Sequence, residues 1–221
     1  MYFKNRQQAA ALLAERLISY KGQNPLVLGI PRGAVPMAKI IAEALEGEMD
    51  VVLVHKLGAP DNPEFAIGSV DESGHVYWRE VARTLGLTDA DLAEEKERQL
   101  KILRQRRARY TPVHTPIDPA GRVVIVADDG IATGASMIAA IHSIRAKRPK
   151  KLIAATAVSP YESLQTIHKL ADEVVCLDVP DDFYAVGQFF EEFKPVSDEE
   201  VIALLRQSRL HSRSVKLSEE E

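Results

Sequence analysis

The chain has 221 residues, enough for one α/β domain with a substantial core. Hydrophobic residues make up 46% and charged residues 27%, a balance that argues against disorder, and no apolar run is long enough to span a bilayer. The net charge of −4 argues against general nucleic-acid binding. The first residues show no signal-peptide pattern, and the only cysteine, Cys176, has no partner for a disulfide, so the sequence predicts a cytoplasmic protein.

The first third of the chain predicts a helix, a strand and a second helix. Residues 8–18 are rich in Ala and Leu at helical spacing, and the apolar run 25–30 predicts a buried strand. This strand ends at Pro31-Arg32-Gly33-Ala34, ahead of a predicted helix over 35–45. Such a turn can bind an anion, because a helix N-terminus presents unpaired N–H groups. The alternative is a connecting loop with a solvated arginine.

Residues 51–56 predict the second buried strand, which ends at Lys56. The prolines and acids of 59–64 disfavour regular structure in the next segment. Residues 65–71 and 75–79 then flank a turn, Glu72-Ser73-Gly74, and predict a β-hairpin.

A long polar helix is predicted over 88–110. Thr88 and Asp91 form an approximate capping box at its start. Acids occupy its first half and bases its second half, which matches the helix dipole. With Glu94–Arg98 and Glu97–Lys101 as i,i+4 pairs, the pattern favours a solvent-exposed helix over a nucleic-acid patch.

The most informative stretch is 123–137, V-V-I-V-A-D-D-G-I-A-T-G-A-S-M, where a buried strand leads into two acids and a helix start. Its loop combines glycines that allow close approach of the backbone with hydroxyl donors: Gly130, Gly134, Thr133 and Ser136. The loop suits a phosphate, and Asp128 and Asp129 can accept hydrogen bonds from vicinal hydroxyls of an attached sugar. The stretch therefore predicts a sugar-phosphate site. The alternative is an ordinary turn with two solvated carboxylates.

Other phosphate-binding loops fit this stretch less well. A Walker loop requires Lys after its last glycine, where Ala135 stands, and the dinucleotide fingerprint requires three glycines rather than two.

The rest of the chain continues the alternation of helices and strands. It predicts a helix to residue 147, a strand over 152–158, a helix over 162–170 and a fifth strand over 174–179. Ser197 and Glu200 form a capping box for a last helix, and 212–221 is expected to be a frayed tail. The sequence thus predicts one domain over 1–221, with an inserted lid hairpin and helix over 57–121 and a hood and C-terminal helix over 180–211.

At residues 128–136 the chain resembles the phosphoribosyl-diphosphate signature of type I phosphoribosyltransferases. In that signature an apolar strand precedes two acids, two variable residues, and then a small residue, Thr, Gly, any residue, and Ser or Thr. The resemblance implies a Rossmann-like fold with a five-stranded parallel sheet flanked by helices. It also implies that residues of both turns bind phosphoribosyl diphosphate: Arg32, Gly33, Asp128, Asp129, Gly130, Ile131, Ala132, Thr133, Gly134, Ala135 and Ser136.

The resemblance further implies how these residues act. Asp128 and Asp129 would hold the ribose hydroxyls and favour positive charge on the ring, and the loop would cradle the 5′-phosphate. Arg32 would receive the leaving diphosphate. Because a mobile lid follows the second strand in this family, Lys56 is a candidate catalytic contact to diphosphate, with a solvated lysine as the alternative.

Residues 179–188 are similar to the base-binding segment of purine phosphoribosyltransferases, where Phe183 or Tyr184 would stack on a base. Packing of these aromatics over the sheet is the alternative. Glu191 and Glu192 are the acids downstream of this segment. Hypoxanthine-guanine enzymes carry Asp in the phosphate loop, whereas this chain has Ala132, as adenine enzymes do.

The implied activity is transfer of the 5-phosphoribosyl group from phosphoribosyl diphosphate to a small-molecule nitrogen base, a purine among the candidates, with release of diphosphate. Mg²⁺ would arrive with the substrate, and the scattered histidines predict no metal site of the protein's own. A non-catalytic regulator that binds phosphoribosyl diphosphate or a nucleotide is the alternative. Neither nucleic acid nor membrane is expected as a partner, and a homodimer is one candidate assembly.

Overall fold

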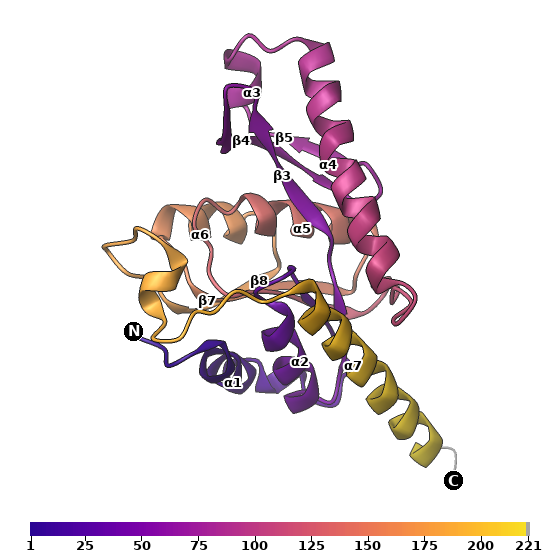
Figure 1. Ribbon diagram of the computed structural model, residues 1–221. Coiled ribbons are helices and arrows are strands. Elements are labelled where there is room, and N and C mark those ends of the chain that lie inside the picture. The colour runs from indigo at the N-terminus through magenta and orange to yellow at the C-terminus, as the bar shows by residue number, and fades with distance from the viewer. Residues whose placement is uncertain (220–221) are drawn as a thin grey trace.

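The fold is centred on a five-stranded parallel sheet with the strand order β2-β1-β6-β7-β8 (Figure 1). A computed structural model describes the backbone of residues 1–219 and the side chains of residues 1–62 and 65–208. The strands are β1 (Leu26–Gly29), β2 (Glu48–Val51), β6 (Val123–Asp128), β7 (Lys151–Val158) and β8 (Glu173–Asp178). The predicted parallel sheet is confirmed.

Helices cover both faces of this sheet. On one side lie α1 (Arg6–Arg16) and α2 (Val35–Ala44), and on the other lie α5 (Ala135–Ala146) and α6 (Tyr161–His168) (Figure 1). The central strand β6 therefore contributes to two apolar layers: Ile125 and Ala127 to one, Val124 and Val126 to the other. A strand buried on both faces needs an unbroken apolar run, as its sequence shows. Its carboxyl end places Asp128 in the middle of the sheet edge.

The prediction of one strand over 51–56 was wrong, because these residues belong to two different strands. β2 ends at Val51, and β3 (Val54–Ala59) leaves the parallel sheet. β3 joins β4 (Asn62–Asp71) and β5 (Val76–Trp78) in a separate antiparallel sheet of order β3-β4-β5. The apolar run continues across the break, so hydrophobic pattern alone does not reveal the change of sheet.

The segment 59–64 also differs from the sequence-based expectation. Ala59 pairs with Asn62, so Pro60 and Asp61 form a short turn between β3 and β4 instead of an irregular loop. The next hairpin is confirmed: β4 and β5 pair across the turn at 72–74. Asp71 stabilises this turn, since its Oδ1 accepts hydrogen bonds from the backbone N–H groups of Ser73 and His75 at 2.9 and 3.0 Å.

After the short α3 (Val81–Thr84), the long helix α4 (Asp89–Tyr110) begins with the predicted Thr88–Asp91 capping box. Most of its residues are exposed, as its charges predict, but one face is covered, because Leu100, Leu103 and Tyr110 are buried. Among the described side chains, its internal ion pairs join Glu95 to Arg98 and Glu97 to Arg104, rather than the expected partners.

The basic end of α4 is tied to α7 (Asp198–Glu219). Arg109 donates to Asp198 and Glu199 at 2.7 Å each, and the Tyr110 hydroxyl donates to Asp198 at 2.8 Å. From the sequence alone, the basic residues at this end of α4 are expected to face solvent. These contacts instead connect the long helix to the C-terminal helix.

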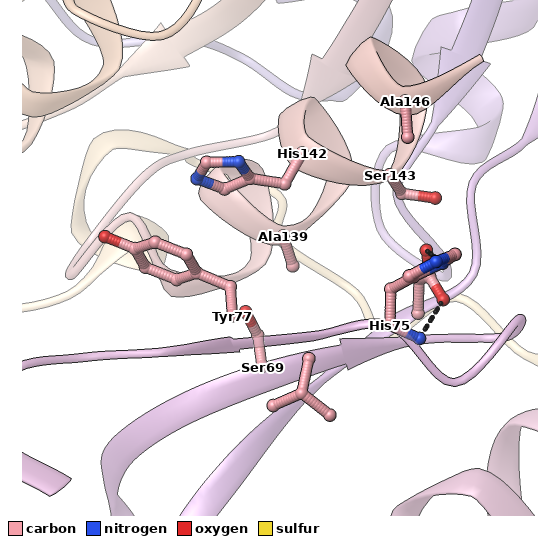
Figure 2. A pocket seen from close by; sticks show the side chains of 9 residues that line it. Ser69, His75, Tyr77, Ala139, His142, Ser143 and Ala146 are labelled. Atoms are coloured by element: carbon pink, nitrogen blue, oxygen red, sulfur yellow. Dashed lines mark hydrogen bonds and ion pairs between the residues drawn. The ribbon is translucent and has the colours of Figure 1, made fainter.

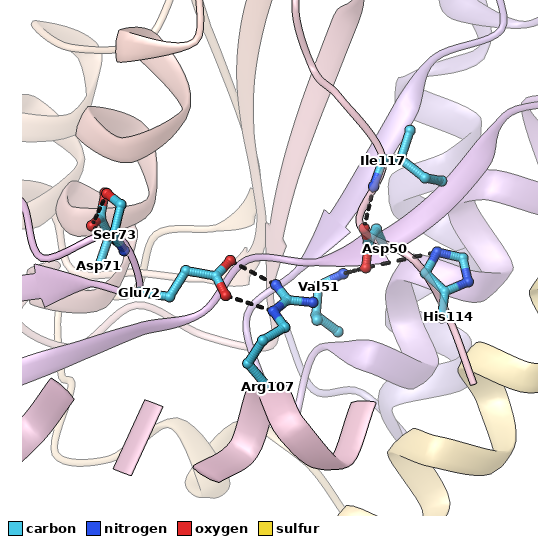
Figure 3. A network of polar contacts seen from close by, with 8 residues as sticks. All are labelled: Asp50, Val51, Asp71, Glu72, Ser73, Arg107, His114 and Ile117. Carbon is cyan, nitrogen blue, oxygen red and sulfur yellow. Dashed lines mark hydrogen bonds and ion pairs between the residues drawn. The ribbon is translucent and has the colours of Figure 1, made fainter. Parts of the chain in front are cut away.

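A polar network also anchors the insertion to the parallel sheet (Figure 3). Arg107 of α4 binds the Glu72 carboxylate with two hydrogen bonds, of 2.5 and 2.7 Å. Nearby, buried Asp50 of β2 accepts from the backbone N–H groups of Val51 and Ile117 at 2.7 and 2.8 Å. Burial raises the pKa of Asp50. These bonds hold residue 117, at the end of the insertion, against the sheet.

Beyond β8 the chain forms a 3-10 turn, η2 (Val186–Phe189), and then α7. The Ser197–Glu200 capping box of α7 is confirmed, with hydrogen bonds of 2.7 and 3.1 Å. The expected frayed tail over 212–221 was wrong as far as the backbone is described, since α7 continues to Glu219; residues 220–221 lie outside the described part. Within that part, no helix combines the length and apolarity required to cross a membrane.

Candidate functional site

The site is built on the loop that follows β6. Two hydrogen bonds fix this loop from neighbouring segments: the Ile131 N–H donates to the Val158 carbonyl at 2.8 Å, and the Ser163 hydroxyl donates to the Ala132 carbonyl at 2.6 Å. The end of β7 and the first turn of α6 thus hold the loop in place. The backbone of the loop is preorganised by the fold around it.

The loop encloses a cavity of about 180 Å³ at the start of α5. Gly134 is the N-cap of α5 and has a φ of 78°, in the left-handed region that glycine adopts without strain. The unpaired N–H groups of the first helical turn follow directly. The cavity is lined by a carboxylate and by the loop residues: Asp128, Gly130, Ile131, Ala132, Thr133, Gly134, Ala135, Ser136 and Met137.

The two acids at the end of β6 have different surroundings. Asp128 lines the cavity, and its Oδ1 accepts the Asp129 backbone N–H at 3.0 Å. Burial, followed by the charge of Asp129, raises the pKa of Asp128 well above its usual value. Burial also raises the pKa of Asp129, but the positive charge of Arg6 opposes this effect.

Arg6 is a site residue that the sequence reasoning missed. Its Nε donates to Asp129 Oδ2 at 2.8 Å, although 123 positions separate the two residues. No local motif joins the first turn of α1 to the end of β6. What distinguishes Arg6 from other arginines is its burial, and burial is not visible before the fold is known.

The second predicted anion turn, 31–34, lies beside the first. β1 and β6 are neighbouring parallel strands, with Gly29 opposite Ala127, so both turns leave the same edge of the sheet. The Pro31–Arg32 peptide bond is cis. A Cβ on Gly33 would lie 2.2 Å from Asp129 Oδ2, so only glycine allows this approach. The fold thus brings Arg32 and Gly33 to the acid pair.

The hood closes over the loop from the other side. A Cβ on Gly130 would lie 2.3 Å from Cγ1 of Val186, so the start of η2 sits directly on the loop. Val186 is a second residue that the sequence reasoning did not single out. Glu191 and Glu192 donate their backbone N–H groups to the carbonyls of Phe3 and Lys4 at 2.9 Å each, which ties the hood to the N-terminus.

The sequence matches a known protein family over most of its length. Residues 2–193 fit the model of the phosphoribosyl transferase domain. The chain belongs to this family.

Known proteins agree with the family assignment. Proteins of two Mycobacterium tuberculosis strains, each named as a candidate phosphoribosyl transferase, are 39% identical to the chain over 92% of its length. The chain spans 46% of the length of these relatives, about half. A crystal structure of a Thermus thermophilus protein matches 94% of the chain and 99% of its own, with a TM-score of 0.83 and 43% identity.

The remaining predicted site residues of this phosphoribosyl transferase domain differ in where they lie and in how exposed they are. Lys56 lies on β3, opposite Ser69, and therefore in the antiparallel sheet rather than at the end of a parallel strand. Phe183 packs on Phe189 with ring centroids 5.4 Å apart. The side chain of Tyr184 is 88% exposed. Of the two aromatic rings, that of Tyr184 is therefore the more accessible to a ligand.

A second cavity, of about 160 Å³, lies between the hairpin and α5 (Figure 2). The Tyr77 ring stacks on His142 of α5, with centroids 4.4 Å apart. Burial lowers the pKa of His142, which favours the neutral ring. No sequence expectation concerned this cavity. It marks where the inserted sheet rests on the helix that begins at the phosphate loop.

Proposed function

We propose that the chain transfers the 5-phosphoribosyl group of phosphoribosyl diphosphate to a nitrogen base and releases diphosphate. The observation that supports this best is the loop cavity: the start of α5 and the half-buried carboxylate of Asp128 share one cavity of about 180 Å³. An anion site next to a hydrogen-bond acceptor fits a sugar phosphate. Membership of the phosphoribosyl transferase domain family agrees with this choice.

In this proposal the 5′-phosphate occupies the loop from Gly130 to Ser136. Backbone N–H groups at the start of α5 and the hydroxyls of Thr133 and Ser136 are the donors, and the helix dipole favours the negative charge. Because neighbouring segments already fix the loop, little ordering is needed when the phosphate binds.

The acid pair would act on the ribose ring. Hydroxyl groups of the sugar donate to Asp128, and this stabilises the ionised carboxylate whose pKa burial has raised. Ligand binding and ionisation of Asp128 thus favour each other. The resulting negative charge stabilises the positive charge that develops on the ring as diphosphate leaves.

The turn 31–34 would receive the diphosphate, with Arg32 as its cation and Lys56 of β3 as a further candidate. In this proposal Mg²⁺ enters bound to phosphate oxygens, because magnesium retains waters and needs few protein ligands. When bound, Mg²⁺ neutralises charge on the leaving diphosphate.

The acceptor base would bind under the hood, next to the loop that Val186 touches. Tyr184 is the more accessible platform, and Phe183 would have to leave Phe189 to stack on a base. Ala132 in the loop favours acceptors other than 6-oxopurines. A role in nucleotide metabolism would follow from a purine acceptor.

The test is release of diphosphate from phosphoribosyl diphosphate and Mg²⁺ across a panel of purine, pyrimidine and other nitrogen bases. Base-dependent release by the parent protein, lost in Asp128→Asn, is expected. Tight binding of phosphoribosyl diphosphate without release for any base would refute the transferase and support the alternative, a ligand-binding regulator. The packing of Phe183 on Phe189 is the observation that favours this alternative, since it leaves one predicted base platform occupied.

A further inference from the structure

Arg6 joins segments of the site that are distant in the sequence. Its Nε donates to Asp129 Oδ2 at 2.8 Å, and its Nη1 donates to the Lys194 carbonyl at 2.7 Å. Its guanidinium carbon lies 3.9 Å from the centre of the Phe193 ring. One side chain of α1 therefore contacts both the acid pair and the end of the hood.

These contacts hold the guanidinium in one place. The side chains of Arg6 and Asp129 are only 10% and 13% exposed. Two directed hydrogen bonds and an aromatic face together fix the planar group, which a lysine ammonium would not match. Arg6 is thus a built-in counter-ion of Asp129 rather than a surface charge in a transient pair.

The pairing makes the two acids of the signature unequal. Asp128 lines the loop cavity, whereas Oδ2 of Asp129 faces Arg6 beneath Gly33. Without a cation, two adjacent buried carboxylates would repel each other and would also repel an incoming phosphate. Arg6 supplies that cation from outside the two anion-binding turns.

We propose that Arg6 is a positioning residue of this site, which holds Asp129 ionised and fixed so that Asp128 faces the ligand. The role rests on the proposed function, because the ligand concerned is phosphoribosyl diphosphate. A ligand that carries a monophosphate and a diphosphate gains most from neutralisation of the acid pair. Arg6 acts through Asp129 and not by contact with the ligand.

Three variants separate charge, hydrogen bonding and packing. Arg6→Gln keeps a donor and removes the charge, whereas Arg6→Lys keeps the charge and loses the planar pair of donors. Arg16→Gln is the matched control, because Arg16 is an exposed arginine of the same helix. Calorimetric titration with magnesium phosphoribosyl diphosphate measures Kd for each protein.

We expect Arg6→Gln to weaken binding at least about tenfold at neutral pH, in line with the loss of a charged hydrogen bond. Arg6→Lys should recover at least half of that loss on a logarithmic scale. Arg16→Gln should bind like the parent. Without ligand, Arg6→Gln and Asp129→Asn should each lower Tm, and the double variant should lower it by less than the sum, as expected for partners in contact.

The pH dependence separates positioning from packing. Asp128 and Arg6 are the charged groups that act on Asp129 within the described chain. Loss of Arg6 raises the pKa of Asp129, so a higher pH is needed to ionise it. The ratio of the Arg6→Gln Kd to the parent Kd should therefore fall as the pH rises. Titration of the ligand itself cancels in this ratio.

A ratio that stays constant with pH, together with equal losses in Arg6→Gln and Arg6→Lys, would show that Arg6 only packs and would overturn its proposed role. Unchanged binding in Arg6→Gln would overturn it too. A parent protein that does not bind magnesium phosphoribosyl diphosphate would instead overturn the proposed function, and this role of Arg6 with it.

Discussion

At the residue scale, the two adjacent acids at the end of β6 differ in their partners. Asp128 is a half-buried carboxylate whose pKa is raised by burial and by its neighbour's charge. Asp129 is paired with Arg6 at 2.8 Å. Removing the charge of Asp128 relieves repulsion, whereas removing that of Asp129 leaves a nearly buried guanidinium without its partner. The sequence shows only two adjacent aspartates, so it does not reveal that their surroundings differ.

The first prediction concerns Asp128→Asn. A pKa raised in the folded state means that the native protein binds the proton more tightly than the unfolded chain. The unfavourable contribution of Asp128 is therefore absent below the unfolded pKa, near 3.8, and develops as the pH rises through the folded pKa. Asparagine does not titrate and can still accept the Asp129 N–H. Asp128→Asn should raise Tm at neutral pH, and the gain should shrink towards pH 4.

Calorimetric melting of parent and variant over this pH range measures the effect. Asp129→Asn is the companion, and it should lower Tm because Arg6 loses its carboxylate. Both variants should weaken binding of phosphoribosyl diphosphate, since an amide is a poorer partner than a carboxylate. A fall in Tm for Asp128→Asn at neutral pH would mean that this acid holds the turn together.

At the element scale, the hood and the phosphate loop are in direct contact. The Gly130 backbone lies so close to Val186 that a Cβ would be 2.3 Å from Cγ1. With any residue other than glycine at position 130, the hood would therefore have to move. The position of the hood thus depends on the backbone of the loop after β6.

The second prediction tests this contact. Gly130→Ala should destabilise the fold by about 1–3 kcal/mol through overpacking. Val186→Ala removes the clashing methyl groups, so the double variant should regain most of the loss. Chemical denaturation of the four proteins measures the coupling. If Val186→Ala gives no rescue, the hood moves aside freely and the contact does not constrain the loop.

The third prediction distinguishes the two hood aromatics. Phe183 packs on Phe189, so Phe183→Ala should lower Tm, whereas Tyr184 is 88% exposed and Tyr184→Ala should leave it unchanged. If Tyr184 is the base platform, its truncation should weaken acceptor binding at least about tenfold, because tenfold corresponds to about 1.4 kcal/mol and base stacking contributes about 1–3 kcal/mol. Binding of phosphoribosyl diphosphate should stay within about threefold, because the loop is held by other segments. An intact acceptor affinity in Tyr184→Ala would exclude it as the platform.

At the scale of the whole molecule, the sequence predicts features that depend on local pattern and misses those that depend on distant contacts. β6, its loop and α5 are continuous in sequence, so their strand, glycine and helix signals predict this strand, turn and helix directly. The change of sheet between Val51 and Val54 has no such signal, because both segments are apolar. The Arg6–Asp129 pair and the contact of Val186 with Gly130 are set by the packing of separate elements.

The charges of α4 show the same limit. Their order matches the helix dipole, and the capping box predicted from Thr88 and Asp91 is confirmed. Yet Arg107 and Arg109 bind Glu72 and α7, which are remote in the chain. A charged helix face reads as solvated until its partners are known. Arg107 thus joins α4 to the hairpin turn within the insertion, and Arg109 joins α4 to the C-terminal helix.

The fourth prediction concerns the stability of the whole fold with its ligand. Phosphoribosyl diphosphate with Mg²⁺, at about 100 times its Kd, should add roughly 2.7 kcal/mol to the free energy of unfolding by mass action. For a domain of this size that corresponds to a rise in Tm of roughly 5–11 °C. Ribose 5-phosphate is the matched probe, because it offers the phosphate and the hydroxyls without the diphosphate. A smaller shift with ribose 5-phosphate would assign the difference to the turn at Arg32, whereas equal shifts would restrict recognition to the loop after β6. The absence of any shift at millimolar ligand would contradict the proposed substrate, since the preformed cavity at Asp128 would then bind something else.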